Sequence, residues 1–297
     1  MKNFILVLLL AFSLPAFADS TVETAGESAK TAPDTLKAIQ RHFKTNYPHI
    51  KGDAFVDGAM NFSRGSKQYN KMWTDRMHDD FDQPESYAVA MAAGKKLWET
   101  PFANGKTFAS CFSNGGKGAA AEYPKVDASG KVVTFENALN ECLVANNEKP
   151  LEYGNMKTMG AMSIVARGLS DGYRIKMKVS SEAEKAAFER GKAIFYTRVG
   201  KLEQACAHCH IKHAGNIART EELSPVIGQA AHFPVFRPNK ATADLEVVTL
   251  HKRYEGCQKN TLVEKPIKPG STESNDLEYF HTYISNGMPL STGVFRK

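Results

Sequence analysis

The sequence has few cysteines and, after its first residues, no long apolar run. Beyond residue 18 no segment approaches the roughly 18 uninterrupted apolar residues that suggest a membrane span, so we expect no later segment to cross a membrane. No polybasic tract is present either, since 38 Lys and Arg and 32 Asp and Glu give a formal charge of +6 over 297 residues. This mild excess favours encounter with anions or an acidic partner and does not indicate nucleic acid. The length suits two domains of ordinary size.

The first residues are typical of a secretory signal. Lys2 precedes an apolar run over residues 4–14, and an Ala-Phe-Ala motif ending at Ala18 offers the small residues that a signal peptidase recognises. We therefore expect cleavage before Asp19 and a periplasmic mature protein, in a compartment where disulfides persist. The alternative, an uncleaved membrane anchor, is disfavoured because the apolar run is too short to span a bilayer.

Two of the five cysteines form a specific motif in the stretch QACAHCHIKHAG. Cys206 and Cys209 lie two residues apart, and His210 follows directly. In an exported protein, C-x-x-C-H indicates haem c held by two thioether bonds, with the adjacent imidazole as proximal iron ligand. One helical turn starting at Cys206 would bring these groups to one edge of the macrocycle. Zinc would need a second ligand pair, and none is obvious; a Cys206–Cys209 disulfide is the other alternative. We interpret His208 and His213 as surface histidines.

Helical patterns flank this motif on both sides. The segment 181–200 predicts a helix, with a capping box at Ser181 and Glu184 and with Phe188, Gly191 and Phe195 on one face. The segment 275–287 predicts a second helix, with Leu277, Phe280, Tyr283 and Ile284 along one face. A glycine on the first helix would let the second cross it closely, as the terminal helices do in small cytochrome c domains, which this part of the chain resembles.

The chain also repeats itself, because residues 86–116 parallel residues 181–215. The matched pairs are Gly94 with Gly191, Trp98 with Phe195, Cys111 with Cys206 and, further on, Cys142 with Cys257. At this alignment Asn114 and Gly115 occupy the places of the second cysteine and the histidine of the haem motif, so the first copy cannot hold haem c by this route. We therefore expect a mainly α protein with two tandem cytochrome c-like domains and one covalently attached haem c. The expected parts are a signal peptide (1–18), an N-terminal extension (19–80), a haem-less cytochrome c-like domain (81–178) and a haem c-binding cytochrome c domain (179–297).

The two cysteines of the first copy would both lie around its vacant haem pocket if the copies share a fold. In an oxidising compartment Cys111 and Cys142 should then form a disulfide. A redox-active dithiol is the functional alternative, but nothing in the local sequence indicates an activated thiol.

Cys257 is then left without a cysteine partner in an exported protein. It lies in the region from which small cytochromes c supply the distal iron ligand. Met288 in NGMP competes for that role, since His/Met ligation is common in electron carriers, although it follows the predicted last helix. Arg253, four residues before Cys257, places a fixed positive charge near the sulfur, where it could favour the thiolate or attract an anion.

Taken together, these features resemble the SoxA family, the catalytic cytochrome subunits of the SoxAX complex, over nearly the whole mature chain. The matching segments are MHDDFDQPES (77–86), GKAIFYTRVG followed by CAHCH, HFPVFRP (232–238), RYEGC (253–257) and the C-terminal LEYFHTYISNGMPL with FRK. In that family the cysteine matching Cys257 is the distal haem ligand and catalytic thiol, often a persulfide, and the arginine matching Arg253 lines the active site. Many members carry two haems, so this chain resembles a single-haem member in which a disulfide replaces the first haem.

The resemblance implies a thiosulfotransferase that couples thiosulfate oxidatively to a cysteine of the SoxYZ carrier, with electrons leaving through haem c. It also implies a heterodimer with SoxX, a monohaem cytochrome c whose haem would take the second electron. Two other classes remain open: an electron-transfer cytochrome c without sulfur transfer, and a purely structural haem module. The former explains the haem equally well, but not a cysteine without a disulfide partner beside an arginine. The amphipathic stretch 35–47 is expected to pack on a domain or partner.

Overall fold

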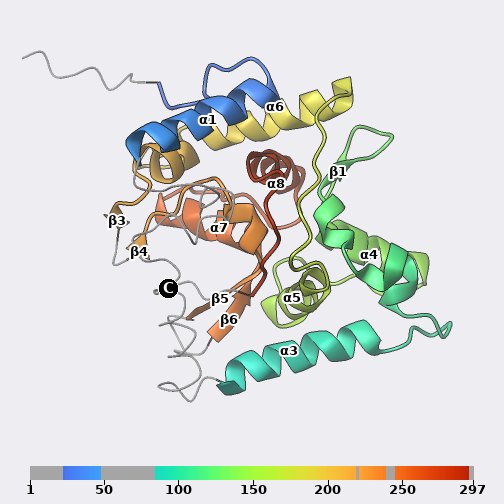
Figure 1. Ribbon diagram of the computed structural model, residues 1–297. Coiled ribbons are helices and arrows are strands. Elements are labelled where there is room, and N and C mark those ends of the chain that lie inside the picture. The colour runs from blue at the N-terminus through green and yellow to red at the C-terminus, as the bar shows by residue number, and fades with distance from the viewer. Residues whose placement is uncertain (1–22, 48–83, 219–220, 239–244, 294–297) are drawn as a thin grey trace, which may run out of the picture.

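The computed structural model describes residues 23–47, 84–218, 221–238 and 245–293 (Figure 1). The predicted signal peptide (1–18), residues 77–83 of the MHDDFDQPES stretch and the final FRK lie outside the described residues. Among those described, no helix has the length and apolarity needed to cross a bilayer.

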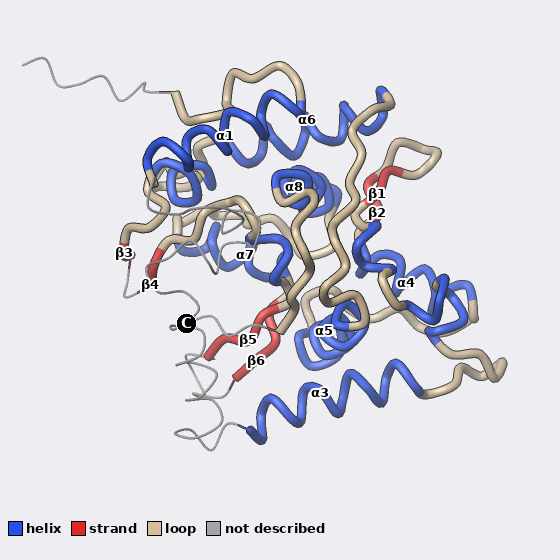
Figure 2. The backbone as a smooth tube through the Cα atoms, viewed as in Figure 1, coloured by secondary structure: helices blue, strands red, loops and turns tan. Residues whose placement is uncertain are grey.

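Helices dominate the described chain, and its strands form three short antiparallel ribbons (Figure 2). The helices are α1 (Ala32–Asn46), α3 (Pro84–Glu99), α4 (Phe135–Ala145), α5 (Ala161–Gly168), α6 (Glu182–Tyr196), α7 (Leu250–Asn260) and α8 (Thr272–Ile284). The ribbons pair β1 (Lys125–Val126) with β2 (Val132–Val133), β3 (Ile217–Ala218) with β4 (Glu221–Glu222), and β5 (Val235–Pro238) with β6 (Leu245–Val248).

The helix before the haem motif begins where its capping residues predict. Ser181 Oγ accepts from the Glu184 amide at 3.2 Å, and a Glu184 carboxylate oxygen accepts from the Ser181 amide at 2.9 Å. This reciprocal pair satisfies two amides that the first turn of α6 would otherwise leave without partners. The helical pattern over 181–200 therefore corresponds to α6.

Two close helix crossings, one in each half of the chain, depend on glycine. A Cβ at Gly191 of α6 would lie 2.0 Å from the Asp276 carbonyl oxygen of α8, and a Cβ at Gly94 of α3 would lie 1.9 Å from the Ala161 carbonyl oxygen of α5. No side chain larger than hydrogen fits at either crossing. The expected close crossing of α6 and α8 is present, and α3 and α5 reproduce it in the first half.

The repetition continues between these crossings. Gly118 and Gly228 adopt left-handed φ values of +80° and +81°, and each precedes a short 3-10 turn. A cis-proline follows each turn, then an antiparallel ribbon, and then a helix capped by a threonine, which is α4 in the first half and α7 in the second. The two halves thus share an order of elements.

The halves are interlocked, because the β1–β2 and β5–β6 ribbons each pack on elements of the other half (Figure 1). The β5–β6 ribbon packs on α3 and on the π-turn at Met156–Gly160. The β1–β2 ribbon packs on α6 and α8, where the Asn275 side-chain amide donates to the Val132 carbonyl at 3.2 Å. One apolar core therefore runs through both halves.

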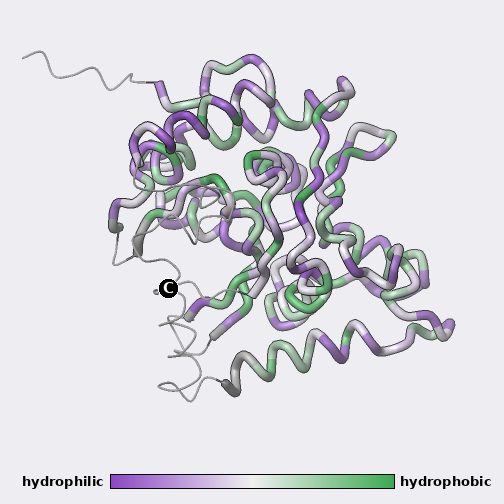
Figure 3. Tube along the Cα trace, viewed as in Figure 1, coloured by the Kyte–Doolittle hydropathy of each residue, from purple (hydrophilic) through white to green (hydrophobic). Residues whose placement is uncertain are grey.

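Helix α8 lies at the centre of the molecule, and residues 274–284 are all buried, although hydrophilic residues alternate with hydrophobic ones along it (Figure 3). Its periodicity predicted one apolar face, and Leu277 and Phe280 on that face are buried. The polar residues Asp276, Glu278 and His281 are buried as well. The hydropathy pattern did not indicate that they are buried, because they are polar and lie in contact with polar groups of neighbouring elements.

The N-terminal segment packs on the second half of the chain. Helix α1 buries Thr35, Ile39 and Phe43 and runs beside α6 (Figure 1). Lys192 of α6 donates to the Ala29 carbonyl, and Tyr196 donates to the Ala25 carbonyl at 2.7 Å. Of the two expectations for the amphipathic stretch 35–47, packing on a domain is the one that the structure shows.

Candidate functional site

The haem-motif residues lie on a helical turn that begins at Cys206 and continues as a π-turn over His208–Lys212. The chain enters this turn through a tight loop in which Val199 and Gln204 exchange backbone hydrogen bonds of 3.2 Å. Cys206 and Cys209 are both free thiols, so the structure does not contain the alternative disulfide between them. In the described part of the chain, no three His, Cys, Asp or Glu side chains are arranged to hold a metal ion.

His210 is held from both its backbone and its ring. Its carbonyl accepts from the Val226 amide at 2.8 Å, and its Nδ1 lies 2.7 Å from the Ser224 carbonyl oxygen. A carbonyl can only accept, so Nδ1 carries the hydrogen and Nε2 is the basic ring nitrogen. A backbone carbonyl on the second ring nitrogen is the usual support of a metal-ligating histidine. The ring is therefore oriented as an iron ligand requires.

A third free thiol, Cys257, comes from α7 and lies within electrostatic reach of the other two. Burial, and then the charge of Cys257, raise the pKa of Cys206 to about 12, and the same two causes raise the pKa of Cys209. A thiol with a raised pKa is a poor nucleophile. These free sulfurs and His210 fit the donor set of a covalently attached haem c.

Helix α7 places Arg253 and Cys257 on adjacent turns, and both side chains are half-buried. Residues four apart lie above one another on a helix, so the side chain of Arg253 starts next to that of Cys257. Between them, Tyr254 points inward, and its hydroxyl lies 2.9 Å from His281 Nδ1 on α8. Burial, and then the charge of His210, lower the pKa of His281 to about 3, so the ring is neutral and its Nδ1 can accept from Tyr254.

Met288, the competing ligand, is buried just after the turn that follows α8. Its amide donates to the Ser285 carbonyl at 3.1 Å, and its own carbonyl accepts from the Ile175 amide at 2.9 Å. The backbone at Met288 is thus bonded to the segment that joins α5 to α6.

Several residues around the motif were not singled out in the sequence. Residues of the N-terminal segment contact the chain just after His210: His42 Nε2 lies 3.3 Å from the Ile211 carbonyl oxygen, and Tyr47 donates to the Ala214 carbonyl. Tyr254 lies inside the quoted RYEGC segment without an assigned role. Its spacing of three from both His251 and Cys257 is the signal that could have identified it as the inward anchor of α7.

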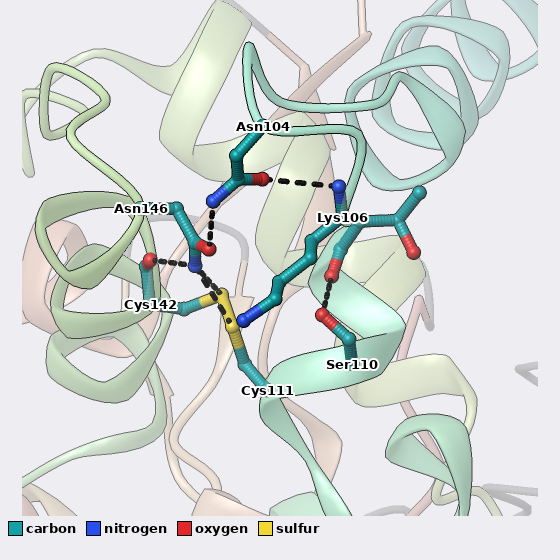
Figure 4. Close-up of a disulfide and its surroundings, with 7 residues drawn as sticks. Asn104, Lys106, Ser110, Cys111, Cys142 and Asn146 are labelled. Carbon is teal, nitrogen blue, oxygen red and sulfur yellow. Dashed lines mark hydrogen bonds between the residues drawn. A yellow bond between two sulfur atoms is a disulfide. The ribbon is translucent and has the colours of Figure 1, made fainter.

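In the first half of the chain, Cys111 and Cys142 form a disulfide with a Cα–Cα distance of 5.8 Å (Figure 4). This is the expected pair, and it joins the short turn at Phe108–Cys111 to α4. The Asn146 side-chain amide donates to the Cys142 carbonyl at 2.8 Å, and its oxygen accepts from Asn104 at 2.8 Å. The bridge therefore lies within a set of polar contacts.

Replacing Cys111 and Cys142 together with Ser should lower the free energy of unfolding by roughly 3 to 4 kcal/mol, because the bridge closes a loop of 31 residues. Urea denaturation monitored by circular dichroism measures this loss, and reduced wild-type protein is the control that should show it too. The haem absorption spectrum should not change, because the bridge lies in the other half. Recovery of two free thiols from unreduced periplasmic protein would contradict the bridge.

Comparison with known proteins places this site in a class. A family model of the SoxA/TsdA cytochrome c domain matches residues 93–175. That segment is the half of the chain without the C-x-x-C-H motif. The matching domain and the C-x-x-C-H turn together define a c-type cytochrome, for which haem c is the implied cofactor.

The relatives define the family more narrowly. L-cysteine S-thiosulfotransferase subunit SoxA of Chlorobaculum tepidum is 38% identical over 263 residues, covering 88% of this chain and 87% of that protein. The SoxA subunit of Allochromatium vinosum is 32% identical over 282 residues, covering 94% and 95%. The crystal structure of SoxXA from P. pantotrophus matches with a TM-score of 0.63 and 29% identity over 75% of this chain and 83% of that one. The chain belongs to the SoxA family and is an L-cysteine S-thiosulfotransferase subunit.

Proposed function

We propose that this chain is the catalytic subunit of a periplasmic enzyme that couples thiosulfate oxidatively to a cysteine of the SoxYZ carrier protein, with Cys257 as the sulfur-accepting thiol. The observation that supports this most directly is the position of Cys257. It is free, half-buried, one helical turn from Arg253, and within electrostatic reach of both thiols of the haem motif. Residues 1–18 would direct export and then be removed by a signal peptidase.

The proposed reaction has two steps. The terminal sulfur of thiosulfate forms an S–S bond with Cys257, the thiol loses its proton, and two electrons leave. The carrier thiolate then attacks that sulfur, which breaks its bond to Cys257, releases the Cys257 thiolate and leaves the thiosulfate unit on the carrier. Arg253 holds the sulfonate oxygens by charge-assisted hydrogen bonds during both steps.

Haem c fits the residues that surround Cys257. Cys206 and Cys209 would hold it through thioethers, with His210 as the proximal and Cys257 as the distal iron ligand. When bound, haem c accepts electrons one at a time. Because the coupling releases two, we propose a heterodimer with a SoxX-type monohaem cytochrome c as the source of the second acceptor, as the similarity to a SoxXA structure supports.

We further propose that residues 81–178 are a cytochrome c-like domain without haem, that residues 179–297 are the haem domain, and that 19–80 form an extension. The backbone supports the absence of haem from the first half. Asn114 and Gly115, at the places of Cys209 and His210, have left-handed φ values of 53° and 62°. Two successive left-handed residues cannot continue a right-handed turn, so the first half lacks the conformation that the motif requires as well as its side chains.

One haem per chain with histidine and thiolate ligation is the expected composition, and a pyridine haemochrome assay on the isolated chain counts the haem. Replacing Met288 with Ala should leave the low-spin spectrum intact, because Cys257 supplies the distal ligand. Two haems per chain would contradict the alignment of the halves. Loss of the low-spin state in Met288→Ala would make Met288 the ligand and the chain an electron-transfer cytochrome.

A further inference from the structure

A buried cluster of charged side chains connects the two halves of the molecule. Arg167 of α5 donates to both carboxylate oxygens of Glu136 on α4, at 2.8 and 2.7 Å, and to Glu278 of α8 at 2.9 Å. The second carboxylate oxygen of Glu278 lies 2.9 Å from His251 Nε2 on α7. Ser163 also donates to Glu136. These helices surround α8 in Figure 1, so the cluster runs from the haem-less half to the helix that carries Cys257.

All four side chains of the cluster are deeply buried, with those of Arg167, Glu136, Glu278 and His251 only 3–7% exposed. Burial opposes the ionisation of Glu136, but the Arg167 charge outweighs it and lowers the pKa of this carboxyl to about 2. Buried ion clusters of this kind are often no more stabilising than apolar residues of the same size. Such a cluster is therefore better explained by its fixing the relative positions of the helices that it joins than by a gain in stability.

The cluster reaches α7 on the face that leads to Cys257. His251 Nδ1 accepts from the Gly270 amide at 3.2 Å, which leaves the ring hydrogen to Nε2. Nε2 lies 2.9 Å from Glu278 in a close polar contact that lacks hydrogen-bond geometry. One turn further along α7, Tyr254 contacts His281 of α8, and Cys257 lies one turn beyond Tyr254, half-buried beside this face. Two polar contacts thus hold this face of α7 against α8, and the first of them is anchored by Arg167.

We propose that Arg167 and Glu278 are positioning residues for Cys257, and that the haem-less half serves the reaction by fixing α7 through them. Arg167 holds Glu278 in place, Glu278 holds His251, and α7 then presents its thiol in one position. This deepens the proposed function, because it assigns a role in sulfur transfer to the half of the chain that has no haem.

The test compares two carboxylates of α8 in the holoprotein, Glu278→Gln and Asp276→Asn. Asp276 is a matched control because it lies two residues away, is buried, and accepts from Arg190 of α6 at 2.7 and 2.8 Å. Glu278→Gln should speed hydrogen exchange of the α7 amides roughly tenfold and broaden the low-spin iron signal of the thiolate-ligated haem, with exchange in α3 unchanged. Asp276→Asn should leave both readouts as in the wild type. Equal α7 exchange in the two variants, or a rise that includes α3, would overturn the proposal.

A second variant separates positioning from stability. The triple change Arg167→Met, Glu136→Gln and Glu278→Gln removes every charge of the ion cluster without leaving a carboxylate uncompensated. We expect its denaturation midpoint to stay close to that of the wild type while α7 exchange and the iron signal change as in Glu278→Gln. An unchanged α7 in this variant would show that the cluster positions nothing. Neither readout uses thiosulfate, so they test positioning even if sulfur transfer takes place elsewhere.

Discussion

Replacing Cys257 with Met should abolish transfer of thiosulfate to the carrier while the haem stays attached and six-coordinate. Attachment depends on Cys206 and Cys209, and a thioether is a competent iron ligand. A thioether has no ionisable hydrogen, however, and cannot form the S–S bond on which transfer depends. We therefore expect Cys257→Met to have the largest effect of any single substitution on sulfur transfer and to leave the haem content unchanged.

The measurement is formation of carrier-bound thiosulfonate by mass spectrometry, with the SoxX partner and an electron acceptor present. Met288→Ala is the control, since it alters the competing ligand and should keep full transfer. Near-normal transfer by Cys257→Met would mean that this sulfur is only an iron ligand.

Replacing Arg253 with Ala should lower kcat/KM for thiosulfate by roughly 30- to 150-fold, or about 2 to 3 kcal/mol, if its contact with the sulfonate is charge-assisted and desolvated. The iron spectrum should change little, because Arg253 acts on the anion and not on the metal. Arg253→Lys should recover only part of the loss, since an ammonium cannot match the two-pronged geometry of a guanidinium.

Lys252→Ala is the matched control for Arg253. It removes the neighbouring cation, whose ammonium lies 2.8 Å from Glu255 and whose side chain is 37% exposed. Steady-state kinetics over a range of thiosulfate concentrations should show near wild-type values for this variant. An equal loss in both variants would indicate that α7 attracts thiosulfate by its general positive charge and that Arg253 has no specific contact.

Much of the architecture was predictable, because glycines indicated close helix crossings and cysteines indicated a disulfide. Gly191 indicated a close helix crossing, and its counterpart in the repeat, Gly94, lies at a second one; neither crossing permits a larger side chain. The pairing of Cys111 with Cys142 followed from their places in the first repeat, and the structure contains that bond. Only glycine fits at such a close crossing, and a disulfide joins one pair of cysteines. The positions of these residues therefore predict which elements are in contact.

The interlocking of the two halves could not be predicted in the same way. Periodicity in α8 identified Leu277 and Phe280, but Glu278 has the composition of an exposed position and is only 2% exposed. Its burial depends on Arg167, which lies 111 residues earlier. Hydropathy records the character of one residue, whereas a buried ion pair depends on two distant ones, so this part of the site appears only in the folded chain.

Mass analysis of the tryptic peptide that contains Cys257 tests the central claim most directly. Trypsin cleaves after Arg253 and Lys259, so Cys257 is recovered in the six-residue peptide from Tyr254 to Lys259. After the oxidised complex with SoxX is incubated with thiosulfate and without carrier, this peptide should gain one thiosulfate unit, or one sulfur if a persulfide remains. Mild reduction or addition of the carrier thiol should remove the added mass. An unmodified peptide from a complex that still modifies the carrier would contradict the assignment of Cys257 as the sulfur acceptor.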